Sequence, residues 1–136
     1  MTLRQSLTRP VALVLSALLA AVALVATVQA PASAAWMTST NIHGGKLQVC
    51  KRYVDGQNYV RFRLDNRQGR HTHLGGFSRT RNGETRSFPV RAAAGRISQV
   101  VQVPVRPSDS FSTGVGEVTG EGAGGGTGPL SSFPRC

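Results

Sequence analysis

The feature that most constrains the fold is a series of short segments in which apolar and polar residues alternate, each closed by residues that favour turns. Asn82-Gly83 is the clearest of these turns, because this pair is typical of two-residue β-hairpins. Counting outward from it pairs Arg79 with Arg86, and Phe77 with Phe88. The sequence therefore predicts two antiparallel strands joined at this turn, with one phenylalanine opposite the other.

A second hairpin is expected around Asp55-Gly56-Gln57-Asn58, between segments 47–54 and 59–65. A four-residue loop would pair Val54 with Tyr59, and a two-residue Asp-Gly loop would leave the same residues on each face. The apolar face should carry Leu47, Val49, Tyr53, Val60, Phe62 and Leu64. The opposite face should carry Gln48, Cys50, Arg52, Tyr59, Arg61 and Arg63.

Further strands are expected at 71–81, 97–105 and 111–119, with a short crossing at 89–96. Residues 120–128 are rich in glycine and are expected to form a flexible loop. No long segment after residue 35 has the spacing of an amphipathic helix. About six strands in about 100 residues predict an all-β fold, a small antiparallel β-sandwich, with a small open barrel as the alternative.

The first 35 residues have the pattern of a secretory signal peptide. Arg4 and Arg9 precede an apolar run at 11–28, and small residues follow at 31–35. An uncleaved membrane anchor is the alternative, because the run approaches the length that spans a bilayer.

We expect cleavage after Ala34 or Ala35, since both positions satisfy the small-x-small rule. Pro31 and the small residues after it argue against an anchor. Residues 36–136 would then form a single all-β domain, secreted to the extracellular medium and free of the membrane.

Cys50 and Cys136 are the only two cysteines of the chain. In an oxidising compartment such a pair predicts a disulfide, here one that ties the last residue to an early strand. The closed loop is long, so the bond is worth about 4 to 5 kcal/mol in the chain-entropy model. Two free thiols are the alternative.

The chain is strongly basic, with a net charge of +10, of which only Arg4 and Arg9 belong to the predicted signal peptide. Cations gather on one face of the first hairpin and around the turn of the second. Like charges placed opposite each other cost stability, so their clustering indicates an anionic partner. The candidate anion-binding residues are Arg52, Arg61, Arg63, Arg79, Arg81 and Arg86. The alternative is a solvated basic surface without a ligand.

The expected partner is a polyanion, such as a cell-wall polymer or an acidic polysaccharide, or else an acidic protein surface. Nucleic acid is not expected, because Tyr59 is the one aromatic residue well placed among these arginines and base stacking needs more. Trp36, at the start of the mature chain, is expected to pack over a sheet edge. The sequence predicts no oligomeric state.

No spacing of nucleophile, base and acid matches a catalytic motif, and the glycine-rich segment lacks the lysine of a phosphate-binding loop. We therefore expect a non-catalytic binding or interaction protein that needs no cofactor. The alternative function is inhibition of a secreted hydrolase through an exposed loop, such as 79–86 or 120–128.

His71 and His73 lie two residues apart on a predicted strand, where both imidazoles could face one metal ion with His43 or Asp65 nearby. A tight zinc site needs three or four protein ligands, and the spacing fixes no third one. We therefore expect two exposed polar residues and no metal site. A metal-dependent enzyme built on this pair is the remaining alternative.

Overall fold

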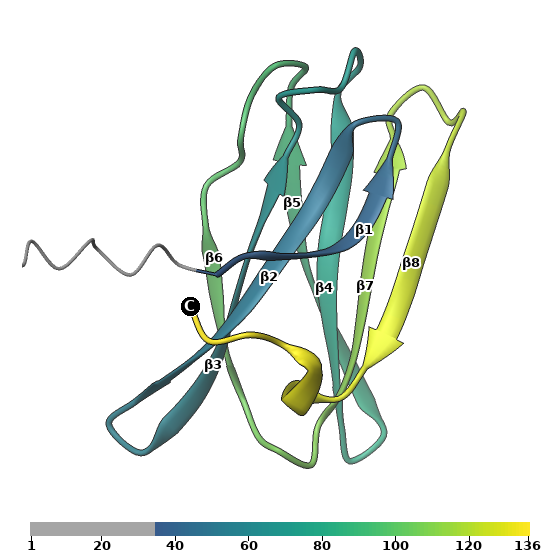
Figure 1. Ribbon diagram of the computed structural model, residues 1–136. Helices are drawn as coiled ribbons and strands as arrows, with labels where there is room; N and C mark the ends of the chain where they lie inside the picture. The colour runs from purple at the N-terminus through teal and green to yellow at the C-terminus, as the bar shows by residue number, and fades with distance from the viewer. Residues whose placement is uncertain (1–34) are drawn as a thin grey trace, which may run out of the picture. The chain divides into compact units, whose positions relative to one another are not determined.

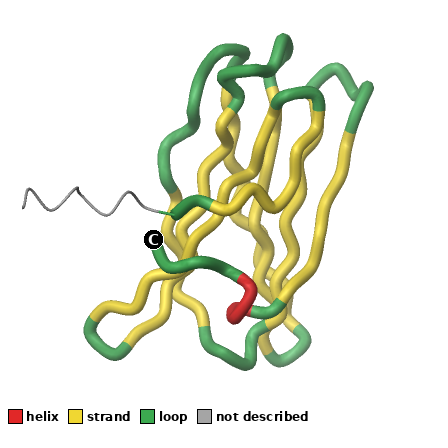
Figure 2. Tube along the Cα trace, viewed as in Figure 1, coloured by secondary structure: helices red, strands yellow, loops and turns green. Residues whose placement is uncertain are grey.

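A computed structural model describes residues 35–136, and the predicted signal peptide lies outside the described residues except for Ala35. This part of the chain forms eight strands and one short 3₁₀ helix (Figures 1 and 2). The strands are β1 (Met37–Ile42), β2 (Gly45–Val54), β3 (Gln57–Asp65), β4 (His73–Arg81), β5 (Glu84–Ala92), β6 (Val101–Val105), β7 (Ser110–Glu117) and β8 (Ala123–Gly128). The helix η1 spans Leu130–Ser132.

The strands make two four-stranded antiparallel sheets, so the fold is the expected sandwich and not a closed barrel. Sheet A has the order β1-β2-β3-β6, and sheet B has the order β5-β4-β7-β8 (Figure 1). Apolar side chains from both sheets meet between them. Phe77 lies within this core, with its ring centre 5.4 Å from that of Phe62 and 5.5 Å from that of Phe111.

The β4–β5 hairpin has the predicted register. Arg79 pairs with Arg86 and Phe77 with Phe88. Asn82 and Gly83 form the turn with φ angles of 52° and 81°, the left-handed conformation that this pair favours.

The turn of the β2–β3 hairpin consists of two residues, Asp55 and Gly56, and Val54 pairs with Gln57. The prediction of a four-residue loop that pairs Val54 with Tyr59 was therefore wrong. The two faces keep their predicted members, because the register differs by two residues. Tyr53 is the exception: its side chain was expected in the core but is 68% exposed. It lies near the end of the hairpin that projects past the rest of sheet A (Figure 1).

The expected count of six strands was too low, because β1 and β8 were missed. The glycine-rich segment 120–128 was expected to be a flexible loop, but most of it is β8, paired to β7. Close packing explains why glycine is present at two of these positions. A Cβ atom would lie 2.8 Å from the Ile42 side chain if added at Gly122, and 2.9 Å from it if added at Gly124. Close packing of β8 against β1 therefore outweighs the poor strand propensity of glycine.

Two other strands differ from their predicted bounds by more than two residues. β6 begins at Val101 and not at residue 97, where Ile97 makes only an isolated bridge to Asp65. β5 continues through Pro89 to Ala92, so the crossing between the sheets is shorter than expected. A proline is tolerated there because β5 lies at the edge of sheet B.

Candidate anion-binding site

The outer face of sheet A carries three of the six candidate arginines. Strand alternation puts Phe62 and Leu64 of β3 in the core, so Arg61 and Arg63 point outward. Arg52 of β2 lies opposite Tyr59 on the same face. No carboxylate among residues 35–136 forms an ion pair with these three arginines.

Trp36 lies against two of these arginines. The guanidinium carbon of Arg63 is 4.4 Å from the centre of the indole ring, and that of Arg61 is 6.0 Å away. These distances are typical of cation–π contacts. The expectation that Trp36 packs over a sheet edge missed this contact, because its position before β1 gives no sign of the partner. We call Trp36, Arg52, Tyr59, Arg61 and Arg63 the basic face.

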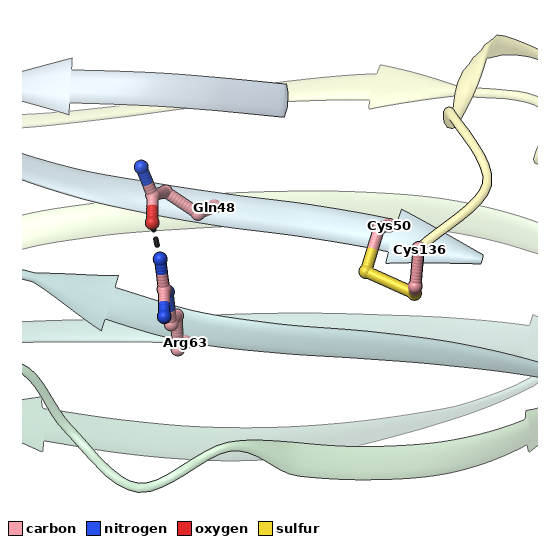
Figure 3. Close-up of a disulfide and its surroundings, with 4 residues drawn as sticks. All are labelled: Gln48, Cys50, Arg63 and Cys136. Carbon is pink, nitrogen blue, oxygen red and sulfur yellow. Dashed lines mark hydrogen bonds between the residues drawn. A yellow bond between two sulfur atoms is a disulfide. The ribbon is translucent and has the colours of Figure 1, made fainter. Parts of the chain in front are cut away.

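Residues of β2 hold part of the basic face in place. Arg63 Nε donates to Gln48 Oε1 at 2.8 Å (Figure 3). Cys50, opposite Arg61, forms the expected disulfide with Cys136, with a Cα–Cα distance of 5.1 Å. The bond fixes the strand from which Arg52 projects.

The C-terminal tail runs beside β2. Lys51 N donates to Pro134 O at 2.8 Å, and Cys136 N donates to Lys51 O at 2.9 Å. The tail leads there from the short helix η1 (Figure 2). Lys51 Nζ donates to the carbonyl oxygens of Leu130 and Ser131 in this helix, both at 3.2 Å. Arg135 is exposed on this tail and pairs with Lys51 of β2, so its side chain lies on the side of β2 opposite to Arg52.

A hollow of about 510 Å³ adjoins the basic face at the end of the hairpin. Its lining is cationic and aromatic, and consists of Lys51, Arg52, Tyr53, Asn58, Arg135 and Cys136. Arg52 belongs to both the hollow and the basic face, whereas Lys51 and Tyr53 alternate with Arg52 along β2 and lie on the opposite face of that strand.

The other three candidate arginines lie on the β4–β5 hairpin and have partners. Arg81 binds Asp109 through two hydrogen bonds of 2.9 and 2.8 Å, and the Asp109 side chain is almost fully buried. Arg86 contacts Glu84 at 2.9 Å, in a pair that is exposed on both sides. Arg79 donates to Pro104 O of β6 at 2.7 Å.

The Arg81–Asp109 pair has a structural effect. The hydrogen bonds from Arg81 lower the pKa of Asp109, against the opposing effect of burial, and the backbone N–H of Arg106 adds to the lowering. The ionised carboxylate thereby holds the turn between β6 and β7. Arg81 is thus engaged within the fold, and the expected repulsion between Arg79 and Arg86 is relieved by their separate partners.

A group of ionisable residues lies where β4 and β7 pair, at His73 and Glu117. His73 is fully buried, with Nδ1 3.0 Å from the carbonyl oxygen of His71 and Nε2 3.6 Å from Glu117 Oε1. Glu117 Oε1 also lies 3.2 Å from His43 Nδ1. Burial raises the pKa of Glu117, but hydrogen bonds from Thr119 and His43 outweigh it, so the pKa is lowered overall.

The two histidines considered as metal ligands occupy different environments. His71 precedes β4 and is exposed, whereas His73 begins the strand and is buried. The expectation of two exposed histidines was therefore wrong for His73. Within residues 35–136, no group of three or more His, Cys, Asp or Glu residues is arranged to hold a metal ion.

No family model, no curated protein and no solved structure matches this chain. Among the described residues, no helix is long and apolar enough to cross a membrane.

Proposed function

We propose that this protein is a secreted, non-catalytic binding protein, and that the basic face holds an anionic polysaccharide or cell-wall polymer. The observation that carries the proposal is the lack of acidic partners for Arg52, Arg61 and Arg63 in the described part of the chain, in contrast to Arg81 and Arg86. Cations without acidic partners are available to an incoming carboxylate, sulfate or phosphate.

The shape of the basic face supports a polymer more than a small ligand. Its arginines lie along a sheet surface, and Arg52 at one end of this row also lines the cationic hollow. Trp36 is half-buried, so part of its indole stays accessible for contact with a sugar ring. A disulfide across β2 and the tail supports residence in an oxidising compartment.

The proposal is tested by replacing the three arginines together, as R52Q/R61Q/R63Q, and measuring affinity for polygalacturonate and dextran sulfate. We expect a large loss of affinity with only a small change in melting temperature, because within residues 35–136 these side chains form no ion pair and lose only a hydrogen bond to Gln48 and the contact with Trp36. The matched control is R70Q/R91Q/R96Q, which removes the same charge from exposed arginines elsewhere. Equal losses in the two variants would mean that net charge alone drives binding, and would overturn the proposal.

Inhibition of a secreted hydrolase is the second candidate function. The exposed turn at Asn82-Gly83 favours it, since an inhibitor acts through such a projecting loop. The other loop considered, at 120–128, is mostly a strand and no longer supports this function. The salt dependence of binding distinguishes the two functions. The affinity for a polyanion falls steeply as the ionic strength rises, whereas the affinity of a loop inserted into an active site does not.

Secretion is tested by the mass of the protein recovered from culture medium. We expect a chain that begins at Ala35 or Trp36 and is lighter than the reduced form by two hydrogens, because of the Cys50–Cys136 bond. A form that stays in the membrane and keeps residues 11–28 would contradict secretion. Two alkylatable thiols would contradict the disulfide in the secreted form.

A further inference from the structure

The sandwich has four edge strands: β1 and β6 in sheet A, and β5 and β8 in sheet B. An edge strand exposes backbone N–H and C=O groups that can pair with another strand. Proteins usually protect such edges with proline, charged side chains or a bulge. The four edges of this sandwich differ in that respect.

Three of the edges carry protection. The pairing of β1 with β2 is interrupted by a register shift between Thr38 and Thr40. β6 has Pro104 within the strand, and β5 has Pro89. β5 also bears several charges, at Glu84, Arg86 and Arg91.

β8 has none of these devices. Its sequence, Ala-Gly-Gly-Gly-Thr-Gly, contains no proline and no charged residue. Its pairing with β7 runs without a break from Phe111 opposite Gly128 to Gly116 opposite Ala123. In Figure 1, β8 forms the outer margin of sheet B, and no described strand lies beyond it.

The direction of the backbone groups of β8 follows from one hydrogen bond. Glu117 N donates to Gly122 O at 2.8 Å, so Gly122 points toward β7. Direction alternates along an antiparallel strand, so Gly124 and Gly126 also face β7. The N–H and C=O groups of Ala123, Gly125 and Thr127 therefore point away from the sheet, and these three residues are exposed.

We propose that β8 is a dimerisation edge that pairs antiparallel with β8 of a second copy. A two-fold axis at Gly125 places Ala123 of each copy opposite Thr127 of the other, and the outward groups then form roughly six hydrogen bonds. Sheet B of one copy and sheet B of the other then form one continuous eight-stranded sheet.

A second copy fits this edge better than a different partner because the edge is its own complement. The residues whose backbone groups point outward are alanine, glycine and threonine. The two edges therefore meet without repulsion between like charges at the contact, although the chain carries a net charge of +10. The arginines of the basic face lie on the other sheet. The dimer would also present two basic faces to one polymer, which raises avidity.

The experiment measures self-association of the purified protein by sedimentation equilibrium up to the millimolar range, with its N-terminus established by mass spectrometry. The variant A123K/T127K places like charges opposite each other twice across the two-fold axis. It should raise the dissociation constant by about ten-fold or more. The variant A123K/T127E places opposite charges at the same two positions, and should restore association.

A matched control, T85K/S87K, adds the same charge to exposed positions of β5, and should leave association unchanged. Melting curves of all variants establish that the sandwich is intact. A monomer throughout the concentration range would overturn the proposal. So would a dimer that A123K/T127K does not weaken, or a monomer whose β8 binds only unrelated extended peptides.

Discussion

His73 shows how single residues fix the end of the sandwich where β4 begins. Its imidazole is fully buried against the backbones of Gly45 and Gly69. A Cβ at Gly45 would lie closer than van der Waals contact to the imidazole, and one at Gly69 would lie 3.2 Å from His73 Cε1. Nearby, Asn66 Nδ2 donates to the carbonyl oxygens of His71 and Ala92, at 2.8 and 3.0 Å.

Replacing Gly45 by alanine should therefore destabilise the protein by about 1 to 3 kcal/mol, because the ring has no room to move. Chemical unfolding measures the effect. Gly76→Ala is the matched control: it is also a strand glycine, but its added Cβ would come no closer than 3.4 Å to any neighbour. Equal effects of the two changes would show that loss of glycine, and not the contact with His73, sets the cost.

Arg81 and Arg86 have the same side chain on the same hairpin but contribute differently to stability. Arg81→Gln leaves the buried Asp109 carboxylate without its partner, and should cost about 2 kcal/mol or more. Arg86→Gln removes an exposed pair and should change the free energy of unfolding little. If both variants unfold at the same denaturant concentration, the structural role of Arg81 is wrong.

The same pair predicts a pH dependence. The pKa of Asp109 is lower in the folded than in the unfolded chain, chiefly because of Arg81. The stabilisation is therefore present above the unfolded pKa, and is lost as the pH falls through the folded pKa. Melting temperatures of wild type and Arg81→Gln should converge as the solution is acidified through this range. A difference that stays constant would contradict the assignment.

Among the strands, local patterns predicted both hairpins but missed the edge strands β1 and β8. Asn82-Gly83 and the alternation in β3 are local signals, and the structure confirms the register and the faces that they gave. β8 has no such signal, since its pairing depends on β7 and its glycines on contact with β1. The ion pair of Arg81 was missed for a similar reason, because Asp109 lies on a distant turn.

The C-terminal tail is an element that depends on one covalent bond. Cys50 and Cys136 are 86 residues apart in sequence, so C50S/C136S should lower the free energy of unfolding by about 4 kcal/mol in the chain-entropy model. Hydrogen exchange should also become faster at the backbone N–H of residue 136, which donates to Lys51 O in the wild type. An unchanged unfolding midpoint would show that the tail is held without the disulfide.

At the scale of the whole molecule, the two sheets carry different surfaces. The outer face of sheet A has arginines without an acidic partner among residues 35–136, together with Trp36 and Tyr59, and the edge strand β8 of sheet B is uncharged. The sequence could predict Arg61 and Arg63 on one face from strand alternation alone. It could not predict Trp36 beside them, because that contact needs the folded path of the chain before β1.

The salt dependence of polyanion binding distinguishes contacts made by the basic face from attraction by the net charge of the protein. The logarithm of the binding constant, plotted against the logarithm of the salt concentration, has a slope set by the number of ionic contacts. For R52Q/R61Q/R63Q we predict a slope about 2 units shallower than that of wild type, while R70Q/R91Q/R96Q keeps the wild-type slope. A slope that is the same for wild type and R52Q/R61Q/R63Q would show that the basic face does not contact the polymer.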